Sequence, residues 1–239
     1  FFGTTVNTIP PNEGEGEGEG DADADADAEG DAGSGETVTY SADGSTVTFT
    51  GTSTDTLSGG TASLTNSTNS KTATIAIVEG YGSIGENAFQ NASSLTEITI
   101  GASVTKIGEY AFYGASNLSK ITFSEGSQLK SIGKQAFYNA TSLTEINIPA
   151  SVTSIGIGAF SGATILSNIT FSEGSAITSI GNYAFSGAKG LTSITIPASV
   201  ESIGHQAFRG ASSLTSITIP ANVTTIGNYA FSIYMTPGS

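Results

Sequence analysis

Apolar residues recur along most of the chain in a fixed order. The hexad Ile-Gly-x-x-Ala-Phe occurs seven times, and its successive phenylalanines lie 23, 25, 23, 25, 23 and 23 residues apart. Between two phenylalanines the same apolar positions return, for example Leu143, Ile146, Ile148, Val152 and Ile155. A fixed period of this length is typical of a solenoid of stacked repeats. The phenylalanines are Phe89, Phe112, Phe137, Phe160, Phe185, Phe208 and Phe231.

Each repeat contains two segments with the pattern of a short strand. Residues 143–148 have the form Leu-x-x-Ile-x-Ile, which alternates at its end and is rich in residues that favour strands. Pro149 ends this strand because proline has no amide hydrogen to donate. Residues 151–155 form a second extended stretch, and the hexad glycine that ends it predicts a turn with positive φ. The following Gly-x-x-Ala-Phe stretch is long enough for a single helical turn.

No stretch shows a 3.6-residue apolar pattern long enough for a full helix. A repeat of this size buries its apolar face only by stacking on its neighbours. The strands of successive repeats would then pair about 4.8 Å apart. This stacking places Glu97, Lys120 and Glu145 in one column of alternating charge, which favours cross-strand pairing.

The chain divides into four segments. Residues 1–10 are an N-terminal segment, 11–35 an acidic low-complexity spacer, 36–80 an N-terminal β cap, and 81–239 the solenoid with an incomplete last repeat. Within the cap, residues 36–40 and 45–49 alternate around Ala42-Asp43-Gly44, which predicts a β-hairpin. We expect this hairpin to cover the first apolar end of the solenoid.

The charge distribution excludes some partners. The formal net charge is −14, and 11 of the 21 acidic residues lie between Glu13 and Glu36. Seven scattered cations do not form the basic face that a nucleic acid requires, so we expect no nucleic-acid partner. No apolar run approaches the roughly 18 to 20 residues of a membrane span. The chain has no cysteine, which excludes disulfides and thiol chemistry.

The acidic tract contains one candidate metal site. Its spacing resembles a calcium loop, in which alternating carboxylates and a terminal glutamate surround the ion and Gly30 makes the sharp turn. A glutamate at the fifth position and the lack of flanking helices depart from that pattern, and a solvated, self-repelling spacer is the alternative. Calcium is therefore the only cofactor we consider. The candidate ligands are Asp25, Asp27, Glu29 and Glu36.

The positions around each hexad phenylalanine differ between repeats. Side chains that vary from repeat to repeat are not required for packing of the core. Tyrosine and arginine are both enriched at protein-binding surfaces. These residues are our candidate ligand-binding positions, with an ordinary solvated edge as the alternative. They are Tyr110, Tyr113, Lys134, Gln135, Tyr138, His205, Gln206 and Arg209.

A strand column offers a second candidate face. Its side chains could present regular polar groups to a glycan, to ice or to another sheet, although threonine is also simply a good strand residue. Two repeats are lengthened by Ser-Glu-Gly-Ser at residues 124–127 and 172–175, and the sequence assigns these expansions no function. The column consists of Thr99, Thr122, Asn147, Thr170, Thr195 and Thr218.

The repeat resembles that of the BspA-like leucine-rich-repeat family. The resemblance rests on the hexad followed by Ala-Ser-Ser-Leu-Thr-Ser-Ile-Thr-Ile-Pro at residues 211–220, and it covers about residues 72–231. It implies a β-rich, right-handed solenoid with a horseshoe shape and its main sheet on the concave side. It also implies a place among surface proteins of host-associated bacteria and some protists, with adhesion as the usual role.

Catalytic chemistry finds no support in the sequence. The Gly-x-Gly-x-x-Gly pattern at residues 80–85 resembles the glycine motif of dinucleotide-binding proteins. However, Gly85 is the repeating hexad glycine, and the sequence predicts no long helix after it. His205 is the only histidine, no nucleophile accompanies it at a recurring spacing, and we expect it to be exposed. We therefore expect no enzymatic activity.

These features predict a secreted or cell-surface module that binds a protein or glycan ligand. The alternative is a structural subunit whose open C-terminal end pairs head to tail with neighbouring copies, so that a filament forms. Calcium on the acidic tract could take part in this assembly.

Overall fold

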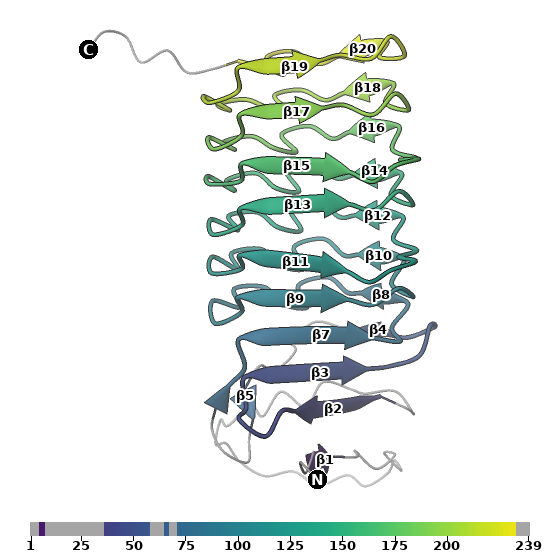
Figure 1. Cartoon of the computed structure of the whole chain (residues 1–239), viewed down its shortest axis with the longest axis vertical. Coiled ribbons are helices and arrows are strands. Elements are labelled where there is room, and N and C mark those ends of the chain that lie inside the picture. Colours follow the sequence, from purple (N-terminus) through teal and green to yellow (C-terminus); the bar gives the residue numbers. More distant parts are fainter. Residues whose placement is uncertain (1–4, 8–35, 58–64, 67–70, 233–239) are drawn as a thin grey trace, which may run out of the picture.

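The computed structural model describes residues 5–7, 36–57, 65–66 and 71–232. They form a right-handed column of stacked coils, with one long strand of each coil on the front face and one short strand behind it (Figure 1). The predicted leucine-rich-repeat solenoid with coils of 23 to 25 residues is therefore confirmed.

The long strands form the main face of the column. Six of them make one sheet in the order β1-β2-β3-β7-β9-β11, while β13 pairs only with β15 and β17 only with β19 within the described residues. The strands are β1 (Thr5–Asn7), β2 (Thr37–Tyr40), β3 (Thr46–Thr50), β7 (Ile75–Glu79), β9 (Glu97–Ile100), β11 (Lys120–Phe123), β13 (Glu145–Ile148), β15 (Asn168–Phe171), β17 (Ser193–Thr195) and β19 (Ser216–Thr218).

The short strands form a second, unbroken sheet behind the main face. Neighbouring members pair in parallel and in register, so Ser131 lies opposite Lys106 on one side and Ser154 on the other. A small antiparallel pair, β5 (Thr65–Asn66) and β6 (Lys71–Thr72), lies outside both sheets. The short strands are β4 (Thr56–Leu57), β8 (Ser83–Ile84), β10 (Lys106–Ile107), β12 (Ser131–Ile132), β14 (Ser154–Ile155), β16 (Ser179–Ile180), β18 (Ser202–Ile203) and β20 (Thr225–Ile226).

A stack of phenylalanine rings runs through the core. From Phe89 to Phe231 the hexad rings lie nearly parallel, with centroids between 4.9 and 5.4 Å apart. Phe49 meets the first of them edge-on at 5.8 Å. All rings from Phe89 to Phe208 are fully buried. Each ring thus packs against both neighbours, and such aromatic pairs contribute about 0.5 to 1.5 kcal/mol beyond the area they bury.

The hexad segments form turns and not the predicted helical turns. The described residues contain no helix. The amide of Phe89 donates to the carbonyl of Ala111 at 2.6 Å, and the amide of Asn91 donates to the carbonyl of Tyr113 at 2.7 Å. Because these donors bond to the next coil, they are not available for bonds within a helix.

The predicted positive φ at the hexad glycine is wrong. Positive φ occurs two residues later, for example at Tyr110 (56°) and Gln135 (51°), and none of the hexad glycines has it. A Cβ added to Gly156 would lie 2.7 Å from the backbone carbon of Gly133 and 2.7 Å from the nitrogen of Lys134. The glycine is therefore required because the backbones of successive coils touch at this point.

The N-terminal part continues the column. Strands β2 and β3 pair antiparallel, and Thr46 of β3 lies opposite Ile75 of β7 in a parallel pair. Strand β4 pairs in parallel with β8. Residues 46–57 therefore already occupy the long-strand and short-strand positions of a coil. The divisions at residues 10, 35 and 80 stay predictions, and the acidic tract lies outside the described residues.

Within the described ranges, no helix is long and apolar enough to cross a membrane.

Candidate functional site

The hexad segments of successive coils lie side by side and form one surface, which we call the hexad face. Five of the predicted binding residues come together there in the second and third coils. We call this group the tyrosine cluster; it consists of Tyr110, Tyr113, Lys134, Gln135 and Tyr138. The rings of Tyr113 and Tyr138 stack with centroids 5.0 Å apart and an interplanar angle of 8°. The Tyr110 ring meets Tyr113 edge-on at 5.9 Å.

A cation lies beside this stack. The ammonium group of Lys134 is 5.4 Å from the centroid of the Tyr110 ring, within the range of a cation–π contact. A hydrogen bond with Tyr110 is the main cause that raises the pKa of Lys134. Lys134 itself is exposed, while the tyrosines are half-buried. The cluster therefore offers a partner flat apolar rings, phenol hydroxyls and one positive charge.

The backbone beneath the cluster is strained. Tyr110 and Gln135 adopt left-handed backbone angles, at a position that is Asn87 in the coil before them and Gly158 in the coil after them. Asparagine and glycine tolerate this conformation, whereas a bulky residue costs on the order of 1 kcal/mol. The chain retains large side chains here against that cost, and such strain is often found where a side chain serves binding.

The other three predicted residues lie in the sixth coil and form a second group with two tyrosines. We call it the histidine cluster: Tyr183, His205, Gln206, Arg209 and Tyr229. Arg209 Nη1 donates to Gln206 Oε1 at 2.7 Å, and Gln206 Nε2 lies 2.9 Å from His205 Nε2. Since the amide nitrogen can only donate, His205 Nε2 is the acceptor. The His205 ring lies edge-on to Tyr183 at 5.3 Å and to Tyr229 at 6.2 Å.

Two members of this cluster, Tyr183 and Tyr229, were not among the predicted binding residues, and the predicted exposure of His205 is wrong. Tyr183 and Tyr229 occupy the same hexad position as Tyr110, and that shared position was the signal for them. His205 is half-buried and not exposed as predicted, because the two tyrosine rings flank it. The two clusters do not touch, since the coil that carries Ser161 lies between them.

The candidate calcium ligands remain untested. Asp25, Asp27 and Glu29 lie outside the described residues. Glu36 is half-buried and forms a hydrogen bond with Tyr81. The burial of Tyr81 is the main cause that raises the pKa of its hydroxyl, and the negative charge of Glu36 is the next. The part of the chain that the structure describes holds no group of three or more potential metal ligands.

Two grooves open in the main face, and their lining includes four residues of the strand column that the sequence offered as a second candidate face: Thr122, Asn147, Thr170 and Thr195. Each groove follows a lengthened coil, and each coincides with a gap in strand pairing, between β11 and β13 and between β15 and β17 (Figure 1). The first groove has a volume of about 710 Å³ and the second about 490 Å³. The signals in the sequence were the Ser-Glu-Gly-Ser expansions and the phenylalanines, Phe123 and Phe171, that precede them.

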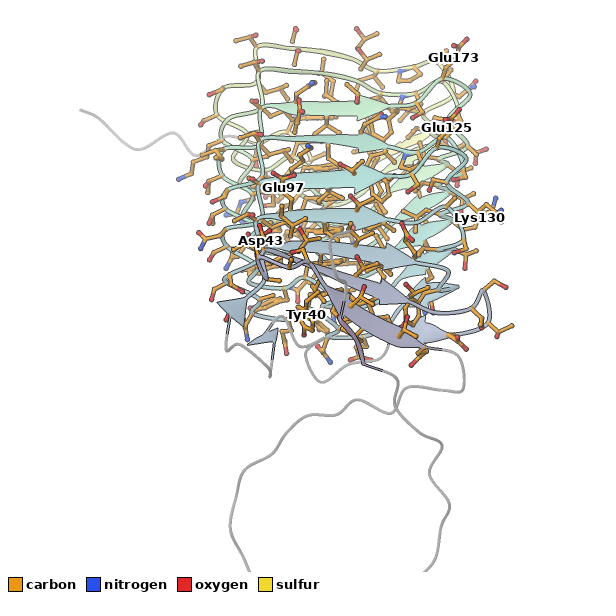
Figure 2. The ribbon with its side chains drawn as sticks, turned by 60° about the horizontal axis from the view of Figure 1, so that its bottom comes forward. Tyr40, Asp43, Glu97, Glu125, Lys130 and Glu173 are labelled. Carbon is orange, nitrogen blue, oxygen red and sulfur yellow. The ribbon has the colours of Figure 1, made fainter. Side chains whose placement is uncertain are left out.

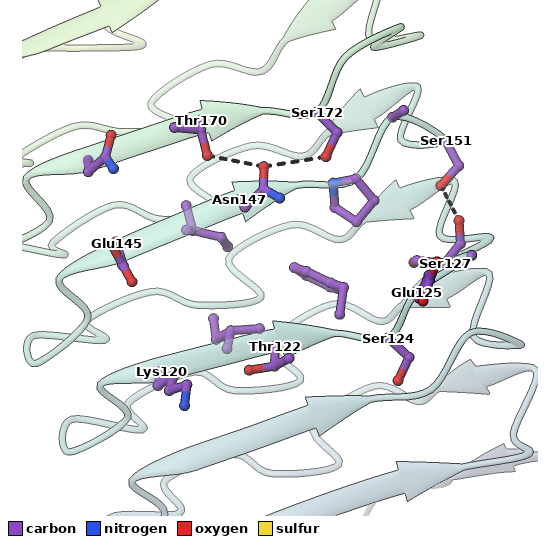
Figure 3. Close-up of a pocket in the computed structure, with 17 residues that line it drawn as sticks. Lys120, Thr122, Ser124, Glu125, Ser127, Glu145, Asn147, Ser151, Thr170 and Ser172 are labelled. Carbon is purple, nitrogen blue, oxygen red and sulfur yellow. Dashed lines mark hydrogen bonds between the residues drawn. The ribbon is translucent and has the colours of Figure 1, made fainter.

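The predicted charge column is divided by the first of these gaps. Lys120 Nζ lies 3.5 Å from Glu97 Oε2 across the paired strands β9 and β11. Glu145 stands on the far side of the gap, and its strand pairs with β15 instead. Lys120 and Glu145 consequently face each other across the first groove (Figure 3).

Comparisons with known proteins agree with the architecture. The family profile described as BspA type Leucine rich repeat region matches residues 63–187 and 130–235, with 6 copies of the repeat. Among solved structures, a leucine rich cell surface protein from Faecalibacterium prausnitzii is 32% identical, with a TM-score of 0.57 over 84% of this chain and 51% of its own. This chain thus spans about half the length of that protein.

A second solved structure supports the fold alone. The leucine-rich-repeat protein of T. pallidum is 22% identical, with a TM-score of 0.57, and the alignment covers 80% of this chain and 82% of that one. No curated protein matches the chain.

Proposed function

Because this chain belongs to the BspA-type leucine-rich-repeat family, we propose that it is a non-enzymatic binding module of a cell-surface protein and that it contacts a protein partner through the hexad face. The F. prausnitzii relative is described as a cell surface protein, which supports display outside the cell. An acidic, low-complexity segment ahead of the repeats is suited to act as a spacer.

The stacking of Tyr113 on Tyr138 is the observation that carries the proposal. Two half-buried aromatic rings, held by their neighbours and by the backbone beneath them, lose little conformational freedom when a partner covers them. Tyrosine is enriched among the residues that dominate protein interfaces. The partner would supply apolar groups against the rings and a carboxylate opposite Lys134.

The histidine cluster supplies a second contact on the same face. Arg209 is held by its hydrogen bond to Gln206, so its guanidinium is oriented before binding. Between the two clusters, Ile157 is 48% exposed and gives the face an apolar middle. An interface that covers both clusters would have an apolar centre with polar and charged groups around it, as protein interfaces commonly do.

Paired substitutions test this proposal. We expect the double variant Tyr113→Ala, Tyr138→Ala to bind a panel of purified matrix proteins, or cells coated with them, about tenfold more weakly than the unaltered chain. The matched control is Ser161→Ala, Ser186→Ala, which changes the residue directly after the hexad phenylalanine in the next two coils. Equal binding by the two double variants would refute a role for the tyrosine cluster.

Head-to-tail assembly is a second candidate. The last described coil exposes apolar side chains whose counterparts one coil earlier are buried: Ile226 is 50% exposed and Ile203 is 1% exposed. A second copy could cover this surface and pair with the edge of β19. Sedimentation velocity at rising concentration, with and without calcium, should then show assembly, and Ile226→Lys should abolish it. Sedimentation as a monomer under all conditions would exclude a filament.

A further inference from the structure

The two grooves have one structural cause. In each lengthened coil the chain adds two residues after the long strand, and Glu125 and Glu173 in these additions project from the same edge of the column (Figure 2). Elsewhere, hydroxyls such as that of Ser119 donate to the carbonyl of the coil below. In the described chain, the equivalent hydroxyls of Thr144 and Thr192, one coil after each addition, make no such bond. The wider coil holds the next long strand away, while the short sheet behind stays unbroken.

From this geometry we propose that the two grooves together bind a neutral, extended oligosaccharide that lies along the axis of the column. The site is separate from the hexad face and goes beyond the protein-binding role proposed above. Its volumes fall in the range of small-molecule binding sites in proteins, which is about 300 to 1,000 Å³.

The walls of the grooves carry hydroxyls and amides suited to sugar hydroxyls. Asn147 Oδ1 accepts hydrogen bonds from Thr170 Oγ1 at 3.0 Å and from Ser172 Oγ at 3.4 Å (Figure 3). These bonds orient the Asn147 amide, whose nitrogen has no partner among the described residues. Thr122 and Asn168 lie on the neighbouring strands that line the same groove. The site therefore holds a fixed donor beside several groups that can both donate and accept.

Each groove also has an aromatic ring. Phe123 lines the first groove and Phe171 the second, and both are half-buried. The neighbouring coils have isoleucine at this position, and Ile100 and Ile148 are fully buried. Both rings also pack against the core, and the part of each ring that lines its groove gives an apolar surface for the C–H face of a sugar ring. Hydrogen-bonding groups beside an aromatic ring match the two faces of a pyranose.

The charge of the grooves favours a neutral ligand. Lys120 is the only cation in the lining of the first groove, where it is accompanied by Glu125 and Glu145. The lining of the second groove has no charged side chain. A phosphorylated, sulfated or carboxylated ligand would need paired cations, which these linings do not supply.

The repetition of the grooves favours a long ligand. They share Asn168, Thr170 and Ser172, so they form one continuous surface. The two equivalent positions are two coils apart, which is at least about 10 Å, because one step is a paired spacing of about 4.8 Å and the other is the wider gap between β11 and β13. One coil corresponds to about one sugar unit of an extended glycan, so a single chain can repeat the same contacts in both grooves.

A peptide strand fits these gaps less well. Inserting a strand into an interrupted ladder requires about 9.6 Å between the flanking strands, twice the normal spacing. Some residues of β11 and β13, and of β15 and β17, keep Cα atoms within 8 Å of each other. The gaps are too narrow for an added strand, although side groups of a ligand can enter them.

Titration calorimetry with defined oligosaccharides tests the proposal. The probes are β-1,4-linked glucose, N-acetylglucosamine and mannose oligomers from disaccharide to hexasaccharide, with heparin and oligogalacturonate as charged comparisons. We expect at least one neutral hexasaccharide to bind about tenfold or more tighter than its disaccharide, because it reaches both grooves. Binding of the charged polymers alone, or of no probe in the neutral panel, would overturn the assignment.

Variants on one strand column locate the site. Asn147→Ala with Thr170→Ala should weaken hexasaccharide binding about tenfold and leave the circular dichroism spectrum unchanged. Thr99→Ala is the matched control, because it lies in the same column where the ladder is intact. An equal loss with Thr99→Ala would assign binding to the whole face and contradict the grooves. The Tyr113→Ala, Tyr138→Ala variant should keep full hexasaccharide affinity, so the two proposals can fail independently.

Discussion

The substitution Gly156→Ala tests whether the backbones of successive coils are in contact at the hexad glycine. A Cβ at this position would lie 2.7 Å from two backbone atoms of the coil below, the carbon of Gly133 and the nitrogen of Lys134. Backbone atoms cannot move aside by changing a rotamer, so the two coils must separate locally. Hydrogen bonds that cross this point, such as the one from the Gly156 amide to the carbonyl of Ile132 at 2.9 Å, would then be stretched or lost.

The expected loss of stability follows from these contacts. Overpacking in a close-packed interior costs about 1 to 3 kcal/mol, and the loss of one or two inter-coil hydrogen bonds adds about 1 kcal/mol each. We therefore expect Gly156→Ala to lower the free energy of unfolding by about 3 to 4 kcal/mol. At a urea dependence of about 2 kcal/mol per molar, the unfolding midpoint would fall by roughly 1.5 to 2 M.

A second glycine provides the control. Gly174 has a φ of +74°, and an added Cβ would meet no atom within 4 Å. For Gly174→Ala we expect a loss within about 1 kcal/mol, because left-handed strain is partly offset by a less flexible unfolded chain. Urea unfolding followed by far-ultraviolet circular dichroism measures all of these variants.

Asparagine distinguishes the two explanations of the hexad glycine. It tolerates a left-handed backbone better than alanine does but brings a larger side chain. If close packing is the reason for the glycine, Gly156→Asn will be at least as unstable as Gly156→Ala. Recovery of stability with asparagine would show that backbone conformation sets the requirement, and our explanation would then be wrong.

Three further predictions concern single side chains. Ser151→Ala should lower stability by about 1 kcal/mol, because the hydroxyl bonds the carbonyls of the coil below, whereas Ser199→Ala should be neutral or stabilising because that buried hydroxyl has no partner in the described chain; urea unfolding compares the two. Hydrogen bonds from neighbouring serines, that of Ser41 first, lower the pKa of Asp43 to about 2. The stability that the Asp43 carboxylate adds through these bonds is therefore present above about pH 4 and is lost as the pH falls through about 2. An NMR titration should find the pKa of Asp43 raised towards 3.8 in Ser41→Ala. If calcium binds the acidic tract at a defined site, calorimetry should give one site that Glu36→Gln weakens, and an unaltered isotherm would identify the tract as a solvated spacer.

Much of the fold was predictable because packing repeats along the sequence. A coil must return to the same place after one turn, so residues that face the core recur with the length of the coil. This is why the hexad phenylalanines identified the stacked core correctly. The same logic placed Tyr113 and Tyr138 in one column of the hexad face, and the structure stacks their rings.

The errors arose where one coil acts on the next. The hexad glycine was assigned a positive φ because glycine permits it, whereas its actual role is to let two backbones touch. A helical turn was expected from local length, but amides such as that of Phe89 bond across coils. The clustering of Tyr183 and Tyr229 around His205 was missed because the sequence gives the column and not the direction in which each ring turns.

By itself the sequence determined the period, the inward-facing residues and the family, since these follow from a hydrophobic pattern that each coil must satisfy. Only the tertiary structure decided where pairing between the long strands of the main face is interrupted. The sequence shows the two additional residues in each lengthened coil, but it does not show what they do to the neighbouring strand. Their effect appears between coils. Hydrogen bonds between strands form only within a narrow range of distances, so a slightly wider coil moves the next long strand out of pairing range and a groove opens between the two strands.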